Sequence, residues 1–133
     1  MIISTELLDE VIAHARRDAP NECCGIVATR DGDAVSVHAL ENIQASPLRF
    51  EIDGLRLFEL ITELEDAGLE LGAIYHSHTR SAPYPSQTDI NFAGAWPGVE
   101  WLIVGLAGDE PELRSYVIDD NRQVTEVTLA DVS

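Results

Sequence analysis

The sequence of 133 residues contains no lysine, and its eight basic residues are all arginines, against 24 acidic ones. Its formal net charge is −16 at pH 7. A protein that binds nucleic acid needs a basic surface to neutralise phosphates, so this composition argues against a nucleic-acid partner. The acidic residues are dispersed along the chain, which favours a solvated surface, as in a salt-adapted host, over the steering of a basic partner.

Long apolar runs are also missing. No stretch is long enough to span a bilayer, and Glu6, Asp9 and Glu10 lie where a signal peptide would be positively charged. We therefore expect a cytoplasmic protein without a membrane partner. The length suffices for one hydrophobic core, and the apolar content of 45% is ordinary for a globular protein. Since repeats and linkers are absent, residues 1–133 are predicted to form a single domain.

Cysteine is scarce, and the two cysteines, Cys23 and Cys24, are adjacent. Because side chains alternate across a strand, a disulfide between neighbours would require strained geometry. We expect reduced thiols that pack as small buried hydrophobic residues, the usual role of cysteine in an apolar strand. A nucleophilic thiol beside a histidine is the alternative.

Apolar periodicity predicts helices interspersed with antiparallel hairpins. The dipeptide Asp31-Gly32 between two apolar runs indicates a hairpin. The order predicts an α/β fold with a mixed β-sheet flanked by helices. The predicted helices are Thr5–Arg17, Leu55–Ala67 and a segment that starts at Ser86 and runs through Ile90–Trp96; the predicted strands are Ile26–Thr29, Ala34–Leu40, Arg49–Ile52, Ala73–His78, Trp101–Leu106, Leu113–Ile118 and Val124–Leu129.

The most informative motif is His76-Ser77-His78, followed at a fixed distance by Ser86 and Asp89. Both histidines continue an apolar strand, so their rings point to the same face and can reach one ion. Ser86 is predicted to cap the next helix, with Asp89 in its first turn. Catalytic zinc usually takes three His or carboxylate ligands and a water, whose pKa it lowers to about 7. A nearby carboxylate can then act as general base.

Each of these residues also has an ordinary structural interpretation. A single histidine is commonly a hydrogen-bonded structural residue, and Ser86 with Asp89 alone would form a helix cap. Their joint occurrence favours a metal site. Two other metallohydrolase patterns, His-Glu-x-x-His on a helix and the Cys-x-x-Cys pair of zinc deaminases, are absent from the sequence.

One acidic residue extends this motif into a family signature. Glu22 lies in Pro20-Asn21-Glu22-Cys23-Cys24-Gly25, between a predicted helix and a predicted strand; alone it would be a surface acid. The pattern Glu22, His76-x-His78, seven residues, Ser86, two residues and Asp89 resembles the complete signature of the JAMM (MPN+) metallopeptidases. The resemblance implies their JAMM/MPN fold, which is cytidine-deaminase-like. It also implies one zinc ion bound by His76, His78 and Asp89.

The same resemblance implies catalytic roles for two residues. Glu22 would act as general base and then as general acid toward the leaving amine, while the Ser86 hydroxyl would donate to the developing oxyanion. Asn42 and Tyr84 are candidates for a groove that holds an extended substrate tail. The loops Ile43–Leu48 and Thr79–Pro85 are expected to border the site. His14 and His38 lie outside the signature, and His14 is expected to be a surface or packing residue.

Softer similarity extends over nearly the whole chain, for example in Asn21–Gly25, Tyr75–Thr79, Tyr84–Ser86 and Glu112–Tyr116. These segments are similar to the compact bacterial Mec-type branch of the family. That resemblance implies a small ubiquitin-like sulphur-carrier protein as partner and release of cysteine after its C-terminal Gly-Gly. Two alternatives are an isopeptidase that removes a ubiquitin-like modifier from target lysines and a non-catalytic MPN interaction module.

Overall fold

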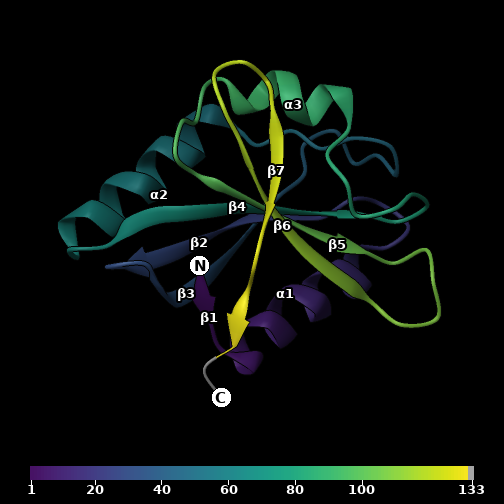
Figure 1. The fold of residues 1–133 in the computed structure, drawn as a ribbon, viewed down its shortest axis with the longest axis horizontal. Helices are drawn as coiled ribbons and strands as arrows, with labels where there is room; N and C mark the ends of the chain where they lie inside the picture. The colour runs from purple at the N-terminus through teal and green to yellow at the C-terminus, as the bar shows by residue number, and fades with distance from the viewer. Residues whose placement is uncertain (132–133) are drawn as a thin grey trace.

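The computed structural model describes residues 1–131. In this part of the chain an eight-stranded mixed sheet has the order β7-β6-β5-β4-β2-β3-β1-β8 and is flanked by helices, as predicted (Figure 1). The elements are β1 (Ile2–Ile3), α1 (Thr5–Asp18), β2 (Cys24–Arg30), β3 (Asp33–Leu40), α2 (Gly54–Asp66), β4 (Glu70–His78), α3 (Gln87–Ala93), β5 (Glu100–Gly105), β6 (Glu112–Ile118), β7 (Val124–Val127) and β8 (Ala130–Asp131).

Strand β4 lies inside the sheet and carries both histidines of the motif. It pairs antiparallel with β2 and parallel with β5. The predicted hairpin joins β2 to β3 through Asp31 and Gly32, whose φ angles of 53° and 85° match the positive values that a type I′ turn requires. Strand β5 is buried on both faces, as its continuous apolar run predicts. The histidines therefore lie on an inner strand next to a strand that is buried on both faces.

The helices cover opposite faces of the sheet. Figure 1 shows α1 on one side and α2 and α3 on the other. One core cluster contains Val11 and Ala15 from α1, and the other contains Leu57, Leu60 and Leu64 from α2. Because side chains alternate along a strand, β4 contributes to both cores, and His76 points to the face that α2 and α3 cover.

The predicted strand Arg49–Ile52 is wrong. These residues form an extended connection before α2 and have no ladder partner among the described strands. Their backbone polar groups are bonded in part by the Asn42 side chain, which accepts from Glu51 N and donates to the Arg49 carbonyl. An alternating apolar pattern can thus arise in an irregular connection that turns only its apolar side chains toward the core.

Two short strands were not predicted. Strand β1 pairs parallel with β3 and with β8, each over only one or two residue pairs. Two residues are too few to produce a periodic apolar signal. No helix within residues 1–131 has the length and apolar character that a membrane crossing requires.

Candidate metal centre

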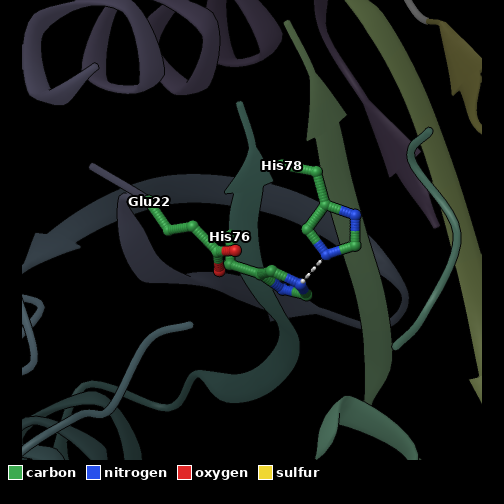
Figure 2. A group of neighbouring side chains, drawn as sticks. All are labelled: Glu22, His76 and His78. Carbon is green, nitrogen blue, oxygen red and sulfur yellow. Dashed lines mark hydrogen bonds between the residues drawn. The ribbon is translucent and has the colours of Figure 1, made fainter. Parts of the chain in front are cut away.

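The two histidines of β4 are buried and meet at their ring nitrogens. His76 has no exposed surface and His78 is 5% exposed. Alternation along the strand places both side chains on the same face, and their Nε2 atoms lie 3.1 Å apart (Figure 2). The sequence-based expectation that both rings can reach one point is confirmed.

Helix α3 brings Asp89 to the same point. Its N-cap is Ser86, whose hydroxyl accepts a hydrogen bond from Asp89 N, while Asp89 Oδ2 accepts one from Ser86 N. This capping box fixes the carboxylate in the first turn of the helix. The same Oδ2 atom lies 3.0 Å from His76 Nε2 and 3.3 Å from His78 Nε2.

The three atoms form a nearly regular triangle with the dimensions of a metal site. A tetrahedral ion with bonds of about 2.0–2.1 Å, as zinc has with nitrogen and oxygen ligands, keeps its ligand atoms roughly 3.3–3.4 Å apart. The separations of 3.0, 3.1 and 3.3 Å are close to one face of such a tetrahedron. These three atoms fill three corners of the tetrahedron and leave the fourth for another ligand.

Hydrogen bonding of the His78 ring turns the lone pair of Nε2 toward the Asp89 carboxylate, where a proton or a metal ion is needed between them. His78 Nδ1 lies 2.8 Å from the Ala82 carbonyl, which can only accept, so Nδ1 carries the proton. In the neutral ring, Nε2 is then an acceptor that faces the acceptor oxygen of Asp89. Two acceptors at 3.3 Å require a proton or a metal ion between them. A backbone carbonyl that fixes the tautomer in this way is the usual support of a metal-binding histidine.

Electrostatics at the centre follow from burial and close charges. Burial lowers the pKa of His76 despite the adjacent carboxylate. Burial alone would lower the pKa of His78, but its hydrogen bonds to Asp89 and Ala82 raise it. For Asp89, burial acts to raise the pKa, and the two histidines nevertheless hold it well below its ordinary range. Asp89 is therefore a carboxylate at any pH near neutrality.

Glu22 approaches the centre from the segment between α1 and β2, as predicted. Its carboxylate and the ligand nitrogens of His76 and His78 lie within 4.8 Å of one another, and the side chain points toward the histidines (Figure 2). Glu22 is only 5% exposed. Burial raises the pKa of Glu22 to about 7; the charge of His78 opposes this shift and that of Asp89 adds to it. A carboxyl group with this pKa can both accept and donate a proton near neutral pH.

The raised pKa predicts a pH-dependent stability of the metal-free protein. Because the native state keeps the Glu22 proton up to about pH 7 and the unfolded state loses it near the ordinary pKa, Glu22 makes stability fall as pH rises between these values. Replacing Glu22 with glutamine should remove this loss. In denaturant titrations with a chelator, we expect the stability of the variant relative to wild type to increase from pH 5 to pH 8 by ~3 kcal/mol at most.

The matched variant is Glu63→Gln on the exposed surface of α2. Its stability relative to wild type should stay level over the same pH range. If the stability of Glu22→Gln relative to wild type also stays constant between pH 5 and pH 8, the raised pKa of Glu22 is contradicted.

A small apolar pocket adjoins the centre. It has a volume of about 80 Å³ and is lined in part by Leu48, Phe50, Ser86 and Phe92. Its walls come from the connection before α2 and from α3, which meet beside Asp89. The loop that contains Leu48 borders the site as predicted, and so does the loop after β4, through the Ala82 carbonyl.

Several other predicted residues lie away from the centre. His14 is a packing residue: its ring is buried on α1, 2.6 Å from the Tyr75 hydroxyl and 3.1 Å from Asp18 Oδ2. Both cysteines are buried free thiols, as expected. Burial raises the pKa of Cys23 to about 11 and that of Cys24 to about 12, so neither is a ready nucleophile near neutral pH.

Two features of the site were missed or misread in the sequence. Phe50 stacks on the His76 ring at a centroid distance of 4.5 Å, which the wrong strand prediction for this segment concealed. Asn42 is not a groove residue, because its side chain is buried and bonded to the chain itself. Tyr84 is exposed and packs edge-on against Tyr116. Of these residues, only Phe50 could have been found from the local sequence, because it is an aromatic residue in a short alternation of apolar and charged residues.

Known proteins are similar in sequence to most of this chain. Residues 4–119 match the model of prokaryotic homologues of the JAB domain. The CysO-cysteine peptidase of Mycobacterium tuberculosis is 36% identical over 123 residues, which cover 90% of this chain and 84% of the relative. A probable TtuB-protein conjugate cleaving protease of Thermus thermophilus is 37% identical over 124 residues, covering 92% and 79%.

A solved structure shows the same fold. A JAB1/MPN domain protein from Archaeoglobus fulgidus matches with a TM-score of 0.68 over the full length of both chains, at 20% identity. The mixed sheet has the fold of a JAMM/MPN domain. It carries paired histidines on an inner strand and a carboxylate at the start of the following helix, a donor set that fits a metal ion. The chain belongs to the family of prokaryotic JAB-domain homologues, and it is a peptidase of the JAMM type.

Proposed function

We propose that this chain is a zinc-dependent peptidase that hydrolyses the amide bond after the C-terminal Gly-Gly of a small ubiquitin-like sulphur-carrier protein, with release of cysteine. One zinc ion would be held by His76, His78 and Asp89, and Glu22 and Ser86 would be the catalytic residues. The observation that carries the proposal is the convergence of Nε2, Nε2 and Oδ2 within 3.3 Å beside a buried Glu22.

Glu22 is placed to act as the proton carrier of the reaction, because its buried carboxylate lies beside both histidines. When bound, zinc supplies a Lewis acid that polarises a carbonyl and makes water nucleophilic near pH 7. Glu22 would take the proton of the attacking water and return it to the leaving amine; its burial, which raises its pKa in the metal-free chain, favours the protonated form that the second transfer needs. His78 keeps its lone pair toward the ion because Ala82 holds the Nδ1 proton. Asp89 contributes the negative charge of the ligand set.

Ser86 is suited to donate to the oxyanion. Its hydroxyl oxygen accepts from Asp89 N, so capping occupies a lone pair and leaves the hydroxyl proton for another acceptor. The residue is exposed and lines the pocket beside Asp89. A fixed donor next to the reacting carbonyl stabilises charge that develops only in the transition state.

This double role predicts two separable effects of Ser86→Ala. Loss of the cap should lower the free energy of unfolding by about 1 kcal/mol. Loss of the donor should lower kcat roughly 10²- to 10³-fold. Ser4→Ala is the matched control, because Ser4 caps α1 through the same hydroxyl bond, to Leu7 N. It should cost similar stability and leave kcat unchanged; equal kcat losses in the two variants would refute the oxyanion role.

The substrate proposal has a narrower basis. The M. tuberculosis relative is named for CysO-cysteine, and the matched region covers most of both chains. An extended tail would reach the centre from the side of Ser86, because Ser86 is exposed while Glu22 and the histidines are buried. Glycines before the scissile bond have no side chains, so the backbone of the tail could approach the buried centre closely. The cytoplasmic location and the single-domain organisation of residues 1–133 stay predictions.

An isopeptidase is the second candidate. The T. thermophilus relative is named for cleavage of TtuB-protein conjugates, in which a modifier is attached to another protein. The same catalytic residues would serve both reactions. The two substrates differ only in the leaving amine, which is that of a cysteine in one case and of a lysine side chain in the other.

A mass-spectrometric assay separates the candidates. The zinc-loaded protein is incubated with a sulphur carrier that bears one extra cysteine after Gly-Gly, and in parallel with the carrier joined to a lysine side chain. Loss of the cysteine residue alone is the expected result. Faster release from lysine would favour the isopeptidase, and an intact carrier in both reactions would contradict the proposed function.

A further inference from the structure

The backbone of Glu22 is held by a segment distant in sequence. Glu22 lies in the irregular connection between α1 and β2, where the sheet does not hold its own backbone. Its N–H donates to the Ser46 carbonyl at 2.9 Å, and its carbonyl accepts from Asn42 Nδ2 at 3.0 Å. Both polar groups of its main chain therefore depend on residues 42–46.

Asn42 is the centre of this arrangement. Its Nδ2 also donates to the Arg49 carbonyl at 3.0 Å, and its Oδ1 accepts from Gln44 N at 3.1 Å and Glu51 N at 3.0 Å. An amide side chain offers two donor hydrogens and two acceptor lone pairs, so all four are used. The residue is 8% exposed, which makes each of these bonds costly to break.

The segment that Asn42 folds also forms part of the site. Phe50, which follows one of the bonded carbonyls, stacks on the His76 ring. Leu48 and Phe50 line the pocket beside Ser86. One buried amide thus connects the main chain of Glu22 with the residues that pack against a histidine of the centre and line its pocket.

We infer that Asn42 is a positioning residue that sets the distance between the Glu22 carboxylate and the water it deprotonates. A general base must be within hydrogen-bond reach of its proton, and small displacements lower the rate strongly. The Glu22 side chain is only 5% exposed and is confined by its surroundings, so the position of its main chain decides where the carboxylate lies. The expected effect on kcat rests on the proposed function. The role of Asn42 in holding the main chain of Glu22 does not depend on catalysis.

Asn42→Asp removes the donor half of the amide and keeps the acceptor half. The aspartate keeps an acceptor for Gln44 N and Glu51 N but places an oxygen against the carbonyls of Glu22 and Arg49. We expect kcat to fall about 10- to 100-fold, with KM within roughly threefold of wild type. Zinc affinity, measured by chelator competition, should change less than about threefold, because no proposed ligand is altered.

The matched control is Gln44→Ala. It lies in the same segment, and its exposed side chain bonds only to Glu51 Oε1, while its backbone N–H to Asn42 is retained. Its kcat and KM should equal those of wild type. If Asn42→Asp raises KM and leaves kcat unchanged, the segment serves substrate binding alone and the inference is wrong. Should Asn42→Asp fail to fold, Asn42→Ala, which adds no charge, is measured in its place.

A second measurement does not depend on activity. Amide hydrogen exchange at Glu22, whose N–H is bonded to Ser46, should be about tenfold faster in Asn42→Asp, whereas exchange of the His76 amide in β4 should be unchanged. Unchanged exchange at Glu22 would overturn the inference. If wild type cleaves no carrier but the exchange result holds, the proposed function fails and the structural role of Asn42 remains.

Discussion

Replacing Glu22 with glutamine is expected to reduce turnover of the carrier by roughly 10²- to 10⁴-fold, the range that a general base contributes. Glutamine has nearly the same shape, and its main chain keeps the bonds to Asn42 and Ser46. The amide cannot accept the proton of the attacking water. Because the proposed ligands are untouched, bound zinc, measured by elemental analysis, should stay at the wild-type ratio.

The control for this experiment is another acidic residue treated in the same way. Glu63→Gln changes the net charge by the same amount on the exposed surface of α2 and should leave kcat unchanged. A Glu22→Gln enzyme that retains wild-type activity would eliminate Glu22 as the base. A variant that loses zinc together with activity would instead make Glu22 a ligand.

Replacing His76 with alanine is expected to remove both zinc and activity. His76 Nε2 is one corner of the proposed triangle, and no other described nitrogen lies at that corner. Affinity for zinc should fall by more than about 100-fold, beyond the loss that follows from altering a residue that only supports a ligand. Chelator competition measures the affinity, and the carrier assay measures the activity.

A histidine outside the centre provides the comparison. His38 lies on β3 and bonds to the Ser36 hydroxyl at 2.8 Å. His38→Ala should keep one zinc ion per chain and wild-type turnover. Retention of stoichiometric zinc by His76→Ala would contradict the proposed ligand set. Since the substitution also removes the ring on which Phe50 stacks, circular dichroism is needed to show that the variant is folded.

The parts of the site that local sequence determines were predictable. Strand alternation placed His76 and His78 on one face, and the capping pattern of Ser86 and Asp89 started a helix where α3 begins. Both rules act over four residues or fewer, so they do not depend on the tertiary fold of the rest of the chain. The approach of Glu22 to the histidines involves more than fifty intervening residues. No local rule predicts it, and the family resemblance supplied it instead.

The connection from Asn42 to Ile52 shows where local rules fail. A strand was predicted over Arg49–Ile52, where two apolar residues alternate with charged ones; Ile52 is buried and Phe50 partly buried against the same core. Such a pattern records which side chains are buried and carries no information on what bonds the backbone. Here a side-chain amide takes the place of a neighbouring strand. Asn42, a candidate for a substrate groove in the sequence, lies instead in the interior.

The oxygen Asp89 Oδ2 belongs at once to the helix cap and to the metal centre. Under the proposed ligand set, ordering of α3 and ion uptake are therefore linked equilibria, and each changes the free energy of the other by the same amount. Free zinc concentration then becomes a variable of folding, since an ion that binds only the native chain stabilises it by mass action. A carrier tail that packs on α3 would, by the same reciprocity, tighten retention of the ion during turnover.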